Sequence, residues 1–192
     1  MDPQLTDKTV RQYVDIISDQ YYPMTGSVIA VMAAQAAALA ETCIQISLDN
    51  QVDRLDWQDV TTRIEQMAHI KTTLLEWSNQ DISTDRSDNP PSGNNSHQTA
   101  TFDYAIEIAK LSLEAAKKLQ DFGPMTYTSL EDDLEIVIYL LTSTARSAAL
   151  LLKHNLSTVA DTDLTEPYDA ILANLIQQIN QLSVVLPTRP LL

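Results

Sequence analysis

The residues that could do chemistry in this chain are few and scattered. The three histidines are His69, His97 and His154, and no HExxH motif or Cys/His/Asp cluster with ligand spacing accompanies them. We therefore expect no metal site. The single cysteine, Cys43, excludes an intramolecular disulfide, and no basic residue lies within one helical turn of it. A packed thiol is expected there, because a catalytic thiolate needs a basic neighbour.

Arg146 is the most informative charged residue, since it is the one charge between Ile136 and Leu152. The apolar surroundings predict that it is mostly buried. A buried guanidinium needs a partner, because an unpaired buried charge costs about 3–5 kcal/mol. Two interpretations stay open. Arg146 forms an ion pair with another helix, with Glu41 as one candidate partner, or it contacts an anionic ligand.

Six segments have the apolar period of helices. They are 6–17, 27–48, 56–78, 101–122, 130–156 and 165–185. Two of them are nearly uncharged: the second has only Gln35 as a polar residue between Val28 and Ala40, and the fifth has no charge from Ile136 to Ala145. Two apolar helices wrapped by four amphipathic ones predict an all-α bundle of about six helices, with two buried central helices.

Local signals place the ends of these helices. Asp56 is predicted to cap the third helix. Ser129 and Asp132 have the spacing of a capping box before the fifth. Thr165-Glu166-Pro167 is predicted to open the last one. Residues 79–100 are rich in Asn, Ser and Pro and predict one long, flexible polar loop, and 187–192 predict a loose tail. We expect a single domain spanning 1–192, because neither side of the loop has enough helices to cover its apolar faces.

Composition bounds the function. The chain has 192 residues, 44% of them hydrophobic, which is enough for a core. Its formal net charge of −14 disfavours nucleic acid and anionic membranes as partners, because both are polyanions. Only three glycines occur, which disfavours a phosphate-binding glycine loop. The start of the sequence has no basic segment followed by an apolar one, so we expect no signal peptide and a cytoplasmic location.

One short motif carries a resemblance. Pro23-Met24-Thr25-Gly26-Ser27 is followed by the alanine-rich stretch Val28-Ile-Ala-Val-Met-Ala-Ala-Gln-Ala-Ala-Ala-Leu-Ala40. This resembles the cyclodeaminase/cyclohydrolase family of one-carbon folate metabolism, in which a Pro-Gly-Gly-Gly-Ser turn leads into an alanine-rich central helix. Later in the chain, three stretches are similar to that family's fifth helix: Asp132-Asp133, Ala145-Arg146-Ser147-Ala148 and Asn155-Leu156. The resemblance extends from Thr6 to about Leu182.

The resemblance implies a function and an assembly. Family members are all-helical and usually homodimeric, and they bind tetrahydrofolate derivatives. They release ammonia from 5-formimidoyltetrahydrofolate or hydrolyse the methenyl form. The resemblance therefore implies a folate substrate and a homodimer, with no separate cofactor.

The resemblance also assigns site residues. Asp133 is the expected general acid, and Asp81 corresponds to the family's acidic residue after the third helix. Gly26 and Ser27 belong to the turn at the start of the central helix. Arg146 is expected to meet a carboxylate of the substrate, and Tyr127 lies where the family has an Asn.

Two alternatives stay open. Ser27 either donates to an anion or caps its own helix, and capping is favoured. Met24 and Thr25 replace two of the family's glycines. This leaves room for a non-catalytic relative, which would serve as a dimeric protein-interaction module or bind another small anion.

Overall fold

The computed structural model describes residues 5–19, 24–51, 56–80 and 95–182. Within these ranges it contains six α-helices and three short 3-10 helices, and no strand. The α-helices are α1 (Val10–Asp19), α2 (Thr25–Asn50), α3 (Trp57–Ser78), α4 (Asn95–Phe122), α5 (Glu131–Ser157) and α6 (Thr162–Gln181); the 3-10 helices are η1 (Leu5–Asp7), η2 (Gly123–Met125) and η3 (Thr128–Leu130). The predicted all-α bundle of six helices is confirmed.

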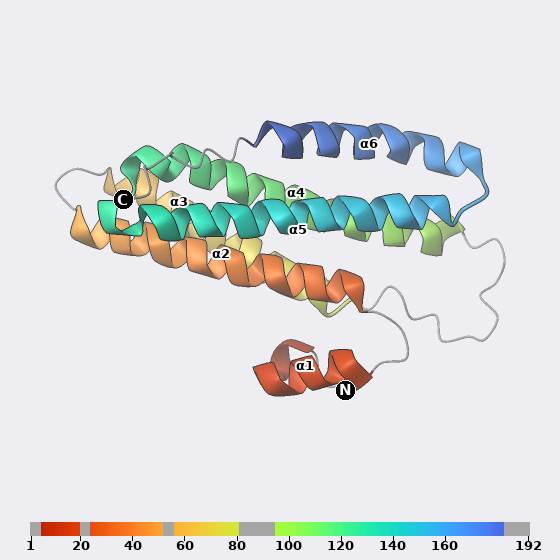
Figure 1. The fold of residues 1–192 in the computed structure, drawn as a ribbon, viewed down its shortest axis with the longest axis horizontal. Helices are drawn as coiled ribbons and strands as arrows, with labels where there is room; N and C mark the ends of the chain where they lie inside the picture. Colours follow the sequence, from red (N-terminus) through yellow and green to blue (C-terminus); the bar gives the residue numbers. More distant parts are fainter. Residues whose placement is uncertain (1–4, 20–23, 52–55, 81–94, 183–192) are drawn as a thin grey trace, which may run out of the picture.

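Four long helices form the centre of the molecule. Helices α2 and α5 lie side by side and run in opposite directions, with α3 and α4 behind them (Figure 1). Helix α6 packs along α5 and α4. Helix α1 lies apart, on the α2 side, and has no buried residue. The preceding segment is held to the end of α3, where the Thr6 backbone N–H donates to Asn79 Oδ1 at 3.2 Å.

The alanines of α2 explain why the bundle is compact around this helix. Ala30, Ala33, Ala37 and Ala40 are fully buried. Small side chains at this spacing let the backbones of neighbouring helices approach toward the short end of the usual 8–10 Å range. They form one hydrophobic cluster with large residues of the other helices, among them Leu74, Ile108, Leu141 and Leu152.

The two central helices are buried on one side only. Exposed apolar residues lie on α2 (Met32, Leu39, Ile46) and on α5 (Ile136, Leu140, Leu150). Among the described residues, two segments are long and apolar enough to cross a membrane, Thr25–Asn50 and Thr128–Ser157; of their most apolar stretches, 56% and 44% of the residues are buried inside the protein.

Local signals predicted some helix ends and missed others. Asp56 caps α3, since its carboxylate accepts from the N–H groups of Gln58 and Asp59. The capping box before α5 is wrong: Leu130 holds the N-cap position, with no side-chain hydrogen bond. The last helix begins at Thr162, earlier than predicted, because Asp161 supplies its cap.

Part of the predicted polar loop is helical. Residues Asn95–Ala100 form the first turns of α4, so the loop assignment is wrong there. Residues 81–94 and the predicted loose tail at 187–192 lie outside the described residues.

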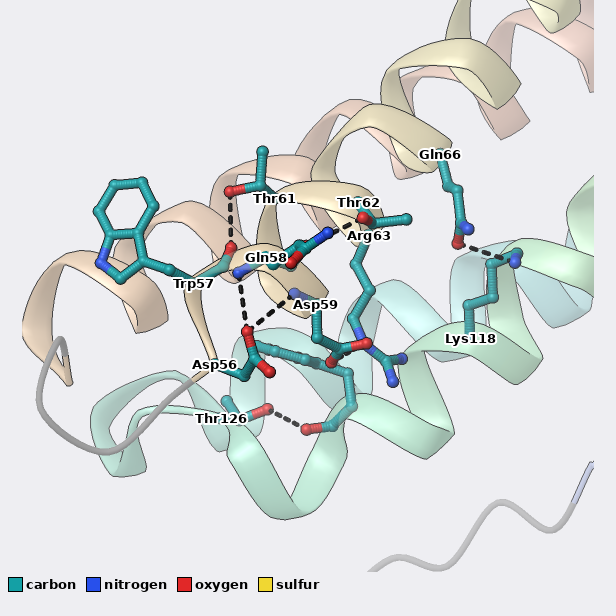
Figure 2. A network of polar contacts seen from close by, with 11 residues as sticks. Asp56, Trp57, Gln58, Asp59, Thr61, Thr62, Arg63, Gln66, Lys118 and Thr126 are labelled. Carbon is teal, nitrogen blue, oxygen red and sulfur yellow. Dashed lines mark hydrogen bonds and ion pairs between the residues drawn. The ribbon is translucent and has the colours of Figure 1, made fainter.

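A group of polar contacts lies at the start of α3, and one of them joins α3 to the last two turns of α4 (Figure 2). Next to the Asp56 cap, Arg63 Nε lies 2.8 Å from Asp59 Oδ2. One turn further along α3, Gln66 Oε1 accepts from Lys118 Nζ of α4 at 2.8 Å. These contacts help to fix the end of the bundle at which α5 begins.

Candidate functional site

Asp133 lies in the first turn of α5, after two other acidic residues, Glu131 and Asp132. All three side chains are exposed. Carboxylates at this position are stabilised by the unpaired N–H groups and the dipole of the helix. Asp133 makes no ion pair within the described part of the chain, so its carboxyl group is open to solvent and to a ligand.

Cys43 of α2 lies near enough to Asp133 to be affected by its charge. Its side chain is buried, as predicted. Burial raises the pKa of the Cys43 thiol, and the nearby charge of Asp133 raises it further. Both causes keep the thiol protonated at neutral pH, and a protonated thiol is a poor nucleophile. Cys43 is therefore a packing residue, and it lies where the start of α5 comes close to α2.

Tyr127 reaches the same end of the bundle through its backbone. Its N–H donates to Ser47 Oγ at 3.0 Å, and Ser47 Oγ in turn donates to the carbonyl of Cys43 at 2.8 Å. Gln51 Nε2 adds a second link, to the carbonyl of Met125 at 3.1 Å. The segment before α5 is thus fastened to the last two turns of α2. We call this cluster, made of Cys43, Ser47, Tyr127 and Asp133, the acidic end.

Gly26 and Ser27 lie at the opposite end of α2. A Cβ atom built on Gly26 would come 2.3 Å from Cε1 of Tyr104, so glycine is needed there for the ring of α4 to pack. The Tyr104 ring also meets Trp77 edge to face, with centroids 5.6 Å apart. Gly26 therefore serves helix packing in this structure. We call this cluster, made of Gly26, Ser27, Trp77 and Tyr104, the packed end.

Ser27 does not cap its helix. Helix α2 begins at Thr25 with Met24 in the N-cap position and no side-chain cap, so the favoured capping interpretation is wrong. Ser27 lies in the first turn with its side chain buried. Its position is 16 residues before Cys43, which corresponds to about 24 Å along the helix axis.

Arg146 is the clearest departure from the sequence-based expectation. It is exposed and makes no ion pair with any described residue, so both its predicted burial and its structural ion pair are wrong. It lines a groove of about 310 Å³ between α5 and α6. The groove has a second cation, Lys153, and no carboxylate among its lining residues. Asp133 is 13 residues away, or about 20 Å along α5.

Glu41, the candidate partner of Arg146, pairs instead with Lys71 of α3, with Nζ and Oε2 2.5 Å apart. Both side chains line a groove of about 350 Å³ between α2 and α3. Asp81 lies outside the described residues. Within the described ranges, no three His, Cys, Asp or Glu side chains gather in a way that could hold a metal ion.

Among the described site residues, Asp133 and Tyr127 lie at one end of α2 and Gly26 and Ser27 lie at the other, while Arg146 lines the groove between α5 and α6. Ser47 was missed by sequence reasoning. Its signal was a serine between apolar residues near the end of an apolar helix, a position at which a buried hydroxyl needs partners on both sides. Lys153 was also missed, although it lies two helical turns after Arg146.

Comparison with known proteins relates this geometry to a family. The family described as Formiminotransferase-cyclodeaminase matches residues 9–84. Among curated proteins, none matches the sequence. Among solved structures, the formiminotetrahydrofolate cyclodeaminase of Thermotoga maritima superposes with a TM-score of 0.75, covering 93% of each chain at 16% sequence identity. The resemblance to the family is confirmed by sequence for residues 9–84, and the solved cyclodeaminase has the same fold as this chain over nearly its whole length.

Proposed function

We propose that this protein binds a reduced folate and acts as a cyclodeaminase or cyclohydrolase on its formimidoyl or methenyl form. The observation that carries the proposal is the double match to one family, in sequence at the N-terminal part and in fold across the chain. The solved relative is by its title a formiminotetrahydrofolate cyclodeaminase. We also propose that the protein works in the cytoplasm and as a homodimer.

Asp133 is the residue proposed to move the proton. Loss of ammonia from a formimidoyl group requires protonation of the leaving nitrogen, and a positioned carboxyl group can supply that proton. Three features of Asp133 support this role: it is exposed, it is unpaired among the described residues, and its backbone is fixed at the start of a long helix. Asp81, which the resemblance implies, is proposed as a second acidic residue.

We propose a separate role for each of the substrate-binding residues. The Tyr127 backbone is tied to α2 through Ser47, so its side chain starts from a fixed point beside Asp133. Arg146 and Lys153 form a cationic groove suited to a carboxylate. Gly26 and Ser27 lie at the opposite end of α2 from Asp133. They can contact the same substrate only if a second copy of the chain brings that end of α2 close to Asp133.

The direct test compares two neighbouring carboxylates. Methenyltetrahydrofolate is the probe, with binding followed by calorimetry and hydrolysis by absorbance. We expect Asp133→Asn to lower turnover by about 10²–10⁴-fold, the usual contribution of general acid catalysis. Asp132→Asn, on the same exposed turn, should leave turnover within about twofold. Wild-type protein that neither binds nor hydrolyses the probe, and shows no stabilisation by either folate form, would rule out the proposed activity.

A second candidate function has one specific observation in its favour. Met24, one of the two residues that replace the family's glycines, is buried, and Tyr104 fills the space beside the retained Gly26. A non-catalytic relative that keeps the bundle as an interaction module fits that observation. It predicts folate-independent assembly, and the double variant Asp133→Asn/Arg146→Gln would then leave assembly unchanged.

A further inference from the structure

The groove between α5 and α6 combines two cations with exposed apolar side chains. Its volume is about 310 Å³. Helix α5 contributes Arg146, Leu150 and Lys153, and α6 contributes Ile176 and Asn180. Leu150 is 60% exposed and Ile176 is 43% exposed, so each helix presents apolar surface to the solvent in the groove. The groove is large enough for a small organic molecule, because pockets for such molecules begin at about 300 Å³.

The two cations lie on either side of one apolar residue of α5. Arg146 and Lys153 are two helical turns apart, which corresponds to about 10 Å along the axis and to nearly the same side of the helix. Leu150 follows Arg146 by one turn and precedes Lys153 by one turn, so it lies between them on that side. A molecule lying along this row would meet a cation, an apolar side chain and a second cation in turn.

These two cations are unpaired in a chain that is rich in acids. Asp and Glu number 26 against 12 Lys and Arg, so most cations of this protein have carboxylates available to them. Neither Arg146 nor Lys153 makes an ion pair with any described residue, and no carboxylate lines the groove. A guanidinium makes its strongest contacts with carboxylates and phosphates, often through two parallel hydrogen bonds. The charges of the groove therefore favour an anionic ligand.

Two other grooves in the described part of the chain differ in this respect. In the groove between α2 and α3, Lys71 pairs with Glu41. The groove between α4 and α6, of about 410 Å³, has three lysines, but Glu114 and Asp121 line it as well. Lys118 of that groove lies 3.4 Å from Glu114. In both grooves the cations have carboxylates beside them, whereas the cations of the α5–α6 groove are left for a ligand.

The groove is also remote from Asp133. Arg146 follows Asp133 by 13 residues, which corresponds to about 20 Å along α5. At 3.6 residues per turn, the two side chains leave the helix about 140° apart. A molecule in the groove of one chain therefore lies far from the Asp133 of that chain, and the side chains of the groove itself select it.

We propose that the groove between α5 and α6 is a binding site for an organic anion with an elongated apolar body, such as a medium-chain carboxylate, and that this ligand is a different molecule from the proposed folate. Its carboxylate contacts Arg146 or Lys153, and its apolar chain covers Leu150 and Ile176. A ligand with a carboxylate at each end contacts both cations. Because the ligand contacts two helices, it also holds α6, which has three buried side chains, against α5.

The first experiment tests the charges, with decanoate and decanedioate as probes and calorimetry on the full chain. We expect decanedioate to bind more tightly than decanoate, and acetate, which lacks the apolar chain, to bind at least about tenfold more weakly than decanoate. Arg146→Gln/Lys153→Gln should raise the Kd of decanedioate at least about tenfold, because it removes both charged contacts. The matched control is Arg63→Gln/Lys110→Gln, which removes two cations that pair within their own helices. It should leave the Kd within about threefold.

The second experiment tests the apolar surface and the location. Leu150→Ser should raise the Kd of decanoate about fivefold or more, because it removes apolar area that the chain would cover. Leu140→Ser is the control, at an exposed leucine of the same helix outside the groove, and should leave the Kd within about twofold. Saturating decanoate should slow amide hydrogen exchange in 171–181 of α6 and leave 57–78 of α3 unchanged.

Three results would overturn the proposal: no binding of either probe at about 1 mM, equal weakening by the two double variants, or slowed exchange confined to helices other than α5 and α6. A fourth concerns the folate. If methenyltetrahydrofolate displaces decanoate and loses affinity in Arg146→Gln/Lys153→Gln, the groove holds a carboxylate of the folate and the separate ligand is ruled out. The decanoate measurements themselves involve no folate. A protein that binds decanoate in the groove but neither binds nor turns over a folate would therefore count against the proposed activity alone.

Discussion

The two ends of helix α2 carry opposite kinds of structure. At the acidic end, polar groups are exposed or linked by hydrogen bonds, and the carboxylate of Asp133 makes no ion pair with any described residue. At the packed end, a glycine, a buried serine and two aromatic rings fill the space closely. The motif that carries the family resemblance belongs to the packed end, whereas the carboxylate suited to proton transfer belongs to the acidic end. A motif can thus carry a resemblance to a family while its own residues serve packing.

The largest expected effect comes from breaking the packed end. Gly26→Ala places a methyl group 2.3 Å from the ring of Tyr104, which cannot retreat because it is itself buried. We expect a loss of about 2–3 kcal/mol of unfolding free energy, in the range of overpacked cores, measured by urea denaturation. Gly123→Ala is the control, since nothing lies within 4 Å of a Cβ built there. Equal losses in the two variants would show that Tyr104 does not confine Gly26.

The next effect concerns the link that holds the acidic end together. Ser47→Ala leaves the N–H of Tyr127 without its acceptor, which should cost about 1–2 kcal/mol of unfolding free energy. Ser112→Ala is the matched control, because among the described residues this buried serine bonds to a carbonyl of its own helix alone, that of Ile108 at 2.8 Å. The hydrogen exchange of Tyr127 should quicken in the first variant only. If Ser112→Ala loses as much unfolding free energy as Ser47→Ala, the loss in Ser47→Ala does not come from the hydrogen bond between Ser47 and Tyr127.

A smaller effect is expected at the neighbouring helix start. Asp56→Ala removes the cap of α3 and should lower the unfolding free energy by about 1 kcal/mol. Ser129→Ala should change it by less than about 0.3 kcal/mol, because Ser129 makes no cap hydrogen bond in the structure despite its capping-box spacing. A larger loss for Ser129→Ala would mean that the capping box forms after all.

The smallest effect is a dependence of stability on pH. The pKa of Cys43 is raised by folding, so the folded protein holds the thiol proton more tightly than the unfolded chain does. Stability from this group is therefore complete below the unfolded pKa of about 8.5 and is lost as the pH rises above it. Between pH 8 and 9.5, Cys43→Ala should lose less unfolding free energy than the wild type. An identical pH dependence in the two proteins would show that the thiol does not titrate differently on folding.

Periodicity and local caps predicted the helices well, because both depend on nearby residues. The Asp56 cap could be predicted because its two donors follow within three residues. Arg146 could not: the sequence shows apolar neighbours on its own helix, but its exposure depends on how far α6 covers α5. Tyr127 was placed by resemblance, and its link to Ser47 joins residues 80 positions apart. No local pattern predicts such a contact.

The helix α4 boundary and the role of Gly26 teach the same lesson. Asn95–Ala100 is polar and was expected to be loop, yet a helix that packs along most of its length can extend through a polar first turn. Gly26 was assigned to the site by resemblance. It makes room for Tyr104, which lies 78 residues later in the chain, and only the folded structure shows that.

The most direct test is to determine where a folate binds on the protein. Amide hydrogen exchange would be measured by mass spectrometry on the full chain, with and without methenyltetrahydrofolate. We expect the ligand to slow hydrogen exchange at the acidic end, in the peptides that cover 43–51 and 125–135. Protection confined to other helices, or none at saturating ligand, would contradict the assignment of the acidic end as the site.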